Sequence, residues 1–215
     1  PPLCKRVEDN KIEGYMFPLG PIMQLFHEIG RGMPGMLSKI GLGTFMDARN
    51  GGGKLNQLTA EQGEDLVKYI PDFEGEDYLW YTLPKLNVAF PRASSADPHG
   101  NISIDKEAEE IEVLSVAQAV KSSGGIVICQ VDELVELHTV NPHMIKVPGI
   151  YIDYIVVAQD REAIPQNMAR TKGATYEPAF TGEVLKEVKT EVASVPLNER
   201  KVIARRAALE LGPGY

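Results

Sequence analysis

The sequence has few cysteines, no surplus of positive charge and no long apolar stretch. Its two cysteines, Cys4 and Cys129, lie far apart in 215 residues, which fits a reducing compartment and a cytoplasmic location. No apolar run approaches the roughly 20 residues that span a bilayer, so we expect no membrane segment. The net charge of −8 argues against non-specific nucleic-acid binding, because that binding needs a basic face.

The chain also lacks an initiator methionine and the apolar segment of a signal peptide, since it begins Pro-Pro-Leu-Cys-Lys-Arg. We therefore expect it to be a piece of a longer protein. Its 43% apolar content is enough for a sizeable core, and its 215 residues suit one large or two small domains.

Several common site signatures are missing. The four histidines show no trustworthy ligand spacing, so we expect no metal site. There is no P-loop, because Lys54 is followed by Leu55, and neither a dinucleotide GxGxxG nor a Gly-x-Ser-x-Gly elbow occurs. Ser94 and Ser95 precede a turn and are most simply structural.

Hydrophobic spacing and turn residues predict an α/β fold with a mainly parallel sheet and flanking helices. In the βαβ unit that we expect, the strand that begins at Ile102 precedes the helix, and an apolar strand buried on both faces, containing Cys129, follows it. Thr59 is a candidate for a capping box, and a hairpin is favoured after it. The acidic cluster between Glu107 and Glu112 is most simply a solvated helix face. Helices are predicted over 15–31, 107–121 and 198–211, the hairpin over 67–81, and strands over 86–90, 102–104, 126–131 and 150–157.

Phe17-Pro18-Leu19-Gly20-Pro21 predicts a helix start, with Gly20 as the N-cap and Pro21 as the first helical residue. The free N–H groups of a helix start bind anions, and a catalytic oxyanion hole needs donors of this kind. From the residues alone a plain strand-to-helix turn is the commoner explanation.

The most informative stretch runs from Gly41 to Asn56 and reads GLGTFMDARNGGGKLN. Glycine lets a backbone approach a ligand closely, and Lys54 adds a positive charge. This glycine-rich run is either a flexible surface loop or a loop that meets an anionic small molecule.

Five segments in the same order resemble the family I CoA-transferases, closest to the propionate/acetate branch. They are YMFPLGPIMQLFHEIGRGMPG, GLGTFMDARNGGGKLN, RASSADPHGNISIDKEA, KVPGIYIDYIVVA and ERKVIARRAALEL. The resemblance covers essentially the whole chain. It implies CoA transfer from an acyl-CoA to a short-chain carboxylate, with CoA as substrate, no cofactor and a homo-oligomeric protein.

Enzymes of this family use a glutamate that forms a glutamyl-CoA thioester, and a backbone N–H in a Pro-Gln-Gly segment stabilises the oxyanion. Here that segment is Pro18-Leu19-Gly20, so the resemblance places the donor on Leu19 and replaces the family's Gln by Leu. We assign substrate binding to Gly20 and to four residues of the glycine-rich run, which are Gly41, Gly43, Thr44 and Lys54.

The glutamate motif of the family is absent from this sequence. The resemblance therefore predicts the latter part of a first domain over 1–159, a linker over 160–193 and the first helix of a second domain over 194–215. We expect the isolated chain to be inactive. The alternatives are a non-catalytic α/β binding module and an acyl-CoA thioester hydrolase of the same fold.

Overall fold

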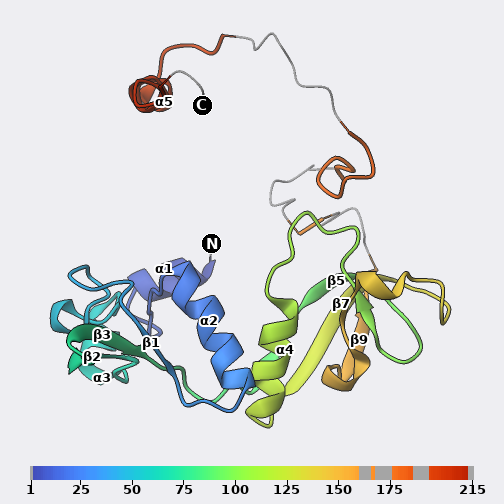
Figure 1. Cartoon of the computed structure of the whole chain (residues 1–215), viewed down its shortest axis with the longest axis horizontal. Helices are drawn as coiled ribbons and strands as arrows, with labels where there is room; N and C mark the ends of the chain where they lie inside the picture. The colour runs from blue at the N-terminus through green and yellow to red at the C-terminus, as the bar shows by residue number, and fades with distance from the viewer. Residues whose placement is uncertain (1, 160–165, 168–175, 186–193, 213–215) are drawn as a thin grey trace.

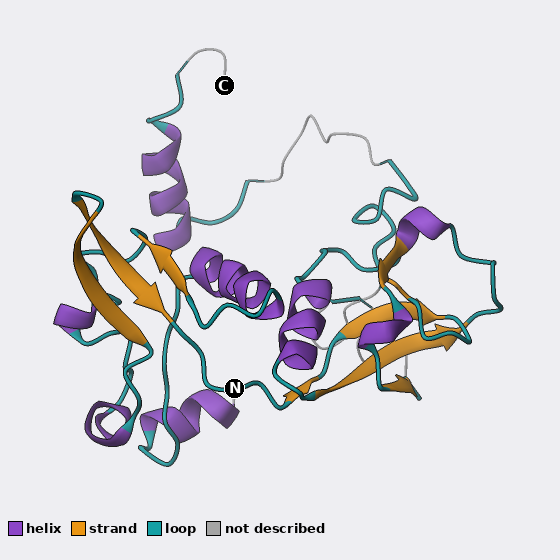
Figure 2. Ribbon diagram, turned by 60° about the horizontal axis from the view of Figure 1, so that its bottom comes forward, coloured by secondary structure: helices purple, strands orange, loops and turns teal. Residues whose placement is uncertain are grey.

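Two β-sheets, each with its own buried core, make up the body of the molecule (Figure 1). The computed structural model describes residues 2–159, 166–167, 176–185 and 194–212. Helices α2 and α4 lie side by side between the sheets (Figure 2). In the described part of the chain, no helix combines the length and apolar character needed to cross a membrane.

The first lobe contains a three-stranded antiparallel sheet with the order β1-β3-β2. The predicted hairpin is confirmed, with Glu74-Gly75 at its turn. Asn56 caps α3 by accepting a hydrogen bond from Thr59 N–H, so the capping box at Thr59 was wrong. The elements are α1 (Pro2–Glu8), α2 (Leu19–Gly30), β1 (Met36–Ser38), the 3-10 helix η1 (Ala48–Asn50), α3 (Gln57–Gln62), β2 (Val67–Phe73) and β3 (Glu76–Tyr81).

The second lobe contains a six-stranded sheet in which β7 is central. Strands β4 and β5 pair with one side of β7 and β9 with the other, all in parallel, while β6 and β8 add antiparallel pairs. The α/β fold class is confirmed. The elements are β4 (Val88–Ala89), β5 (Arg92–Ala96), β6 (Ile102–Ser103), α4 (Val113–Ser122), β7 (Ile126–Leu134), η2 (Pro142–Met144), β8 (Ile145–Val147), η3 (Gly149–Tyr151) and β9 (Tyr154–Val157).

Two strand predictions need correction. The strand that pairs with β7 through the α4 crossover is β5, because β6 turns back at Gly100 and lies antiparallel to β5. Strand β7 is buried on one face only. Val127, Cys129 and Val131 pack in the core, while Ile126 and Gln130 on the other face are exposed. The prediction that this apolar strand is buried on both faces was therefore wrong.

Helix α4 begins six residues later than predicted. Glu107 is buried rather than solvated, and its carboxylate accepts a hydrogen bond from Asn167 N–H at 2.6 Å. The N–H of Ala108 bonds to the Asn167 side chain. These contacts take the backbone of 107–112 away from helical geometry, and Glu112 becomes the N-cap.

Helices α2 and α4 connect the two lobes. A Cβ on Gly30 would lie 3.1 Å from Gln118 Cβ, so the glycine permits a close approach of the helices. His27 Nε2 lies 3.0 Å from the Glu112 carboxylate across the same contact.

Part of the predicted linker, 160–193, lies outside the described residues. Within it, Gln166 is buried and donates a hydrogen bond to Lys106 C=O at 3.0 Å. The predicted last helix is confirmed as α5 (Glu199–Ala208), capped by Asn198 and with no buried residue.

Candidate functional site

Helix α2 begins two residues earlier than predicted, and the first turn therefore starts at the residue assigned as donor. Pro18 is the N-cap and Leu19 the first helical residue. Ile22 N–H is the first to bond backward, to Pro18 C=O at 3.2 Å. Within the described residues the N–H groups of Leu19 and Gly20 have no hydrogen-bond partner. Leu19 is 71% exposed, so these donors lie at the surface of the described chain.

The segment before α2 is fixed against the end of the glycine-rich run. Met16 N–H donates to Gly53 C=O at 2.8 Å, and Tyr15 forms an antiparallel bridge with Lys54. The Phe17 ring packs on the Tyr81 ring with centroids 5.7 Å apart. The helix start and the glycine-rich run are therefore parts of one packed unit.

Asp47 organises the glycine-rich run from inside. Its side chain is 0% exposed and accepts hydrogen bonds from Gly43 N–H at 2.8 Å and from Arg49 N–H at 3.0 Å. The Arg49 guanidinium adds bonds of 2.9 and 2.6 Å to the two carboxylate oxygens. These bonds, with that of Arg49 first, hold the pKa of Asp47 well below its usual range, although desolvation opposes them.

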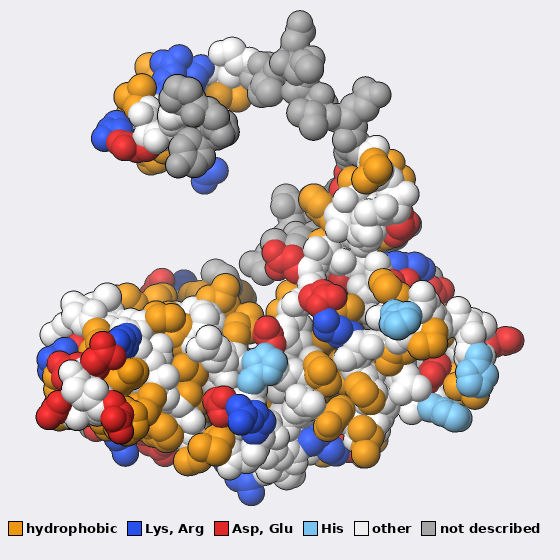
Figure 3. Space-filling model, in the orientation of Figure 1, with side chains coloured by type: hydrophobic (Ala, Val, Ile, Leu, Met, Phe, Trp, Pro, Cys, Tyr) orange, Lys and Arg blue, Asp and Glu red, His pale blue; other side chains and the backbone are white. Residues whose placement is uncertain are grey.

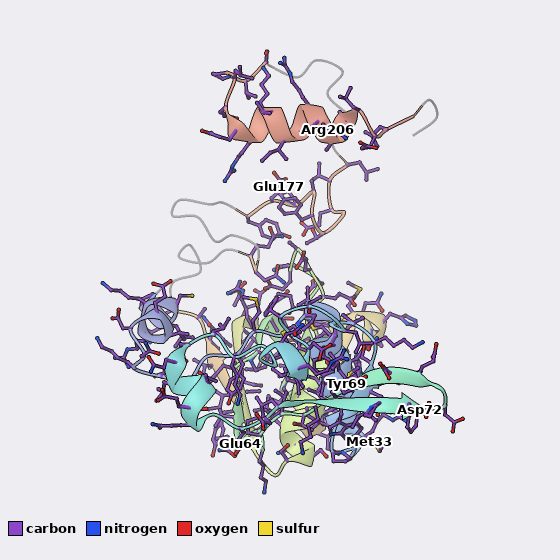
Figure 4. All side chains as sticks on the ribbon, turned by 90° about the vertical axis from the view of Figure 1, so that its left-hand side faces the viewer. Met33, Glu64, Tyr69, Asp72, Glu177 and Arg206 are labelled. Atoms are coloured by element: carbon purple, nitrogen blue, oxygen red, sulfur yellow. The ribbon has the colours of Figure 1, made fainter. Side chains whose placement is uncertain are left out.

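Arg49 is in turn held by the hairpin. Its guanidinium lies 3.8 Å from the centroid of the Tyr69 ring, a cation–π contact. Tyr69 O–H donates to Asp77 at 2.5 Å. Figure 4 shows Tyr69 on the hairpin whose tip carries Asp72. The run is thus a folded loop with a charged centre.

The other assigned residues of the run serve its internal structure. Thr44 O–H donates to Gly41 C=O at 2.7 Å, and the Gly41 backbone lies under Tyr81, where a Cβ would meet the phenol oxygen at 2.5 Å. Lys54 Nζ pairs with Asp65 at 2.8 Å and donates to Gly63 C=O at 3.2 Å. Lys54 also lines a 590 Å³ cavity together with Gly51, Gly52 and Tyr69.

Sequence analysis identified the glycine-rich run and placed the helix start within two residues of its position, but it missed Asp47 as the residue that orders the run. The available signal was its position two residues before Arg49, since Asp accepts hydrogen bonds from nearby backbone N–H groups in turns. The bond from Met16 N–H to Gly53 C=O, three residues before Leu19, holds the helix start beside the end of the run. No group of His, Cys, Asp and Glu in the described part of the chain is arranged to hold a metal ion.

The fold and the helix start define an α/β protein with surface N–H donors that suit an anion or a developing oxyanion. Residues 2–158 match the family model described as Coenzyme A transferase, and the chain belongs to that family.

The chain is similar to caffeate CoA-transferase of Acetobacterium woodii, with 46% identity over 97% of this chain and 38% of the relative. It is 36% identical to the acetate CoA-transferase YdiF of Escherichia coli (strain K12), over 100% of this chain and 38% of the relative. The chain thus spans less than half the length of both relatives.

Solved structures of CoA-transferases also resemble this chain. The acyl-CoA transferase YdiF from E. coli O157:H7, in a thioester complex with CoA, superposes with a TM-score of 0.81 and 34% identity, over 98% of this chain and 39% of that one. Glutaconate CoA-transferase from Acidaminococcus fermentans has a TM-score of 0.59 at 21% identity, over 83% of this chain and 55% of that one, and supports the fold alone.

Proposed function

We propose that the protein that carries this chain transfers CoA from an acyl-CoA to a short-chain carboxylate. The proposal rests chiefly on one observation. In a chain of the coenzyme A transferase family, the N–H groups of Leu19 and Gly20 stand unpaired at the exposed first turn of α2, among the described residues. A thioester carbonyl that is attacked becomes an oxyanion, and such donors stabilise it.

The chemistry needs a nucleophile, which we place on a glutamate outside residues 1–215. Its carboxylate attacks the thioester carbonyl and expels CoA thiolate, leaving a mixed anhydride. The thiolate then attacks the glutamyl carbonyl, releases the first carboxylate and forms a glutamyl-CoA thioester. An acceptor carboxylate attacks this thioester and expels the thiolate, which attacks the acyl carbonyl of the new anhydride. The new acyl-CoA leaves and the glutamate is regenerated.

In this proposal Leu19 N–H is the oxyanion donor, and Gly20 with the glycine-rich residues Gly41, Gly43, Thr44 and Lys54 forms the substrate side of the site. Gly43 N–H and the Lys54 ammonium already have protein partners. They therefore contribute by shaping the loop unless those bonds exchange on binding.

The test is intact-mass analysis of the full-length protein after incubation with acetyl-CoA and no acceptor. We expect a covalent CoA adduct that disappears on addition of propionate with formation of propionyl-CoA. Acetyl-CoA consumption that yields only free acetate and CoA, with or without propionate, would support the hydrolase instead. No adduct and no consumption by the folded protein would favour the binding module.

A further inference from the structure

Asn50 and Gly51 form the only Asn-Gly pair in the sequence, and they lie within the glycine-rich run. The other seven asparagines each precede a residue that has a side chain. This difference matters because the carboxamide of an asparagine is open to attack by the backbone nitrogen of the next residue, and a side chain on that residue hinders the approach. The pair is therefore a candidate site of spontaneous deamidation.

The backbone nitrogen of Gly51 is accessible in the folded chain. Gly51 follows the short helix η1 as its C-cap with φ 115°, and its N–H bonds to no described residue. Gly51 is exposed, and a Cβ built on it would meet no atom within 4 Å. By contrast, the N–H groups of Gly52 and Gly53 both donate to carbonyl oxygens of the run, at 3.0 and 3.1 Å. The nitrogen that would attack Asn50 is thus the one that solvent can deprotonate.

The carboxamide of Asn50 is exposed on the same turn. Its Oδ1 accepts no hydrogen bond from a described residue, so water reaches the oxygen on which negative charge develops when Cγ is attacked. Its Nδ2 donates to Thr44 C=O at 3.0 Å. That bond joins two neutral groups at the surface, where water replaces it at little cost in free energy. Both reacting groups are therefore accessible in the native loop.

We propose that Asn50 is a site of spontaneous deamidation in the folded protein. The Gly51 nitrogen loses its proton to solvent and attacks Asn50 Cγ, which closes a five-membered succinimide ring. The bond from Cγ to Nδ2 breaks, and Nδ2 takes up a proton from solvent and leaves as ammonia. Water then adds to either carbonyl of the ring and opens it, which gives aspartate or isoaspartate at position 50. The net change is one water consumed and one ammonia released.

Either product changes the glycine-rich run. The neutral amide becomes a carboxylate, so the run gains a negative charge three residues after the buried carboxylate of Asp47. A carboxylate has no N–H to donate, so the bond from position 50 to Thr44 C=O is lost. Isoaspartate also adds a methylene group to the main chain just before Gly51. The reaction needs only Asn50, Gly51 and water, and it is therefore independent of the CoA-transfer proposal.

The experiment incubates the full-length protein in mildly alkaline buffer and follows each asparagine by peptide mass spectrometry. We expect Asn50 to lose its amide at least about tenfold faster than any other asparagine of this chain, which corresponds to a barrier lower by about 1.4 kcal/mol. Both aspartate and isoaspartate should appear at position 50. Isoaspartate is diagnostic of attack by Gly51, because direct hydrolysis of the side-chain amide gives aspartate alone. The other seven asparagines serve as controls in the same sample.

Asn50→Gln is the matched variant. It keeps a carboxamide in the run, but attack by Gly51 would close a six-membered ring, which forms far more slowly, so the fast release of ammonia should disappear. An unchanged melting temperature verifies folding, and wild-type protein unfolded in guanidinium chloride verifies that the reaction is detected. The proposal is overturned if Asn50 of the folded protein keeps its amide until the unfolded sample has reacted completely. It is also overturned if another asparagine reacts as fast, if only aspartate forms at position 50, or if folded Asn50→Gln releases ammonia as fast as the wild type.

Discussion

Asp47 shows how a single buried carboxylate can order a glycine-rich loop. Its side chain joins Gly43, at the beginning of the run, to Arg49, and Arg49 stacks on Tyr69 of the hairpin. The charge is buried but fully hydrogen-bonded, the condition under which a buried charge is tolerated. The loop geometry thus depends on ionisation of this residue.

Replacing Asp47 by Asn removes that charge and should destabilise the protein by about 2–3 kcal/mol at pH 7. The folded-state pKa of Asp47 lies below its unfolded value, so its contribution is present above the unfolded pKa and is lost as the pH falls through the folded pKa. Urea unfolding of both proteins should give the full difference at pH 6–8 and a shrinking one below about pH 4. A difference that does not vary with pH would contradict the proposed role of the charge.

Gly52 and Gly53 form a matched pair, because both have positive φ, 61° and 75°, but different surroundings. A Cβ on Gly53 would lie 2.4 Å from Met16 C=O, whereas on Gly52 the nearest atom is 3.8 Å away. Gly52→Ala should cost about 1–2 kcal/mol for its backbone conformation, and Gly53→Ala about 1–3 kcal/mol more for overpacking. Equal losses in denaturant unfolding would show that residues 15–17 do not pack on the run.

Among the elements, β7 carries the core of the second lobe on one face. Cys129 lies on that face, 1% exposed, and burial raises the pKa of its thiol to about 12. Cys4 is exposed on α1. Cys4 can therefore serve as the exposed reference when the reactivity of Cys129 is used to measure how well this core excludes solvent.

In the native protein a thiol reagent should modify Cys4 rapidly and Cys129 slowly, because the thiolate is the reactive form and burial also blocks access. In denaturant the two should react at similar rates. Peptide mass spectrometry after timed labelling separates the sites. Native labelling of Cys129 as fast as that of Cys4 would mean that the packing of β7 on α4 is wrong.

Local sequence patterns were sufficient to predict some of the elements but not others. The hairpin, the β7 strand and the Asn198 cap follow from local signals, namely aromatic alternation, an apolar run and a capping side chain. The start of α4 does not, because residues 107–112 are held by Asn167, some 60 positions away. Pairing of β5 with β7 is likewise decided by tertiary contacts, since β6 is nearer to β7 in sequence.

In the candidate site, too, some features could be predicted from the sequence and others depend on the fold. A helix start within two residues of Leu19 and the glycine-rich run were identifiable from the residues, but their mutual packing depends on the Met16–Gly53 hydrogen bond and the Tyr15–Lys54 bridge. The buried Arg92–Glu107 pair was not foreseen, because an acidic cluster is normally solvated. Only the fold brings Arg92 opposite Glu107.

At the scale of the whole molecule, one face of the larger sheet is apolar and exposed among the described residues. Val88, Ile126, Tyr154 and Val156 lie on it, and hydrophobic side chains gather around β7 and β9 in Figure 3. Both relatives compared above are more than twice as long as the match to this chain. The proposed activity therefore belongs to the full-length protein, and its test must use that protein.

In this structure, Leu19→Pro should remove one backbone N–H donor with little other effect on the helix start. Leu19 is the first helical residue, where proline is well tolerated, its N–H bonds to no described residue, and Pro18 already has the extended backbone that precedes proline. The substitution thus removes one donor and keeps the turn. Leu19→Ala, which retains the N–H, is the matched control.

The most direct test of the account is the rate at which the full-length protein, Leu19→Ala and Leu19→Pro convert acetyl-CoA and deuterated propionate into deuterated propionyl-CoA. We predict transfer by the first two at similar rates, and a loss of about 10²–10³ in kcat for Leu19→Pro at an unchanged melting temperature. A folded Leu19→Pro enzyme with wild-type turnover would mean that the N–H of Leu19 is not the oxyanion donor. Absence of labelled propionyl-CoA from the folded wild-type protein would contradict CoA transfer between these two acids.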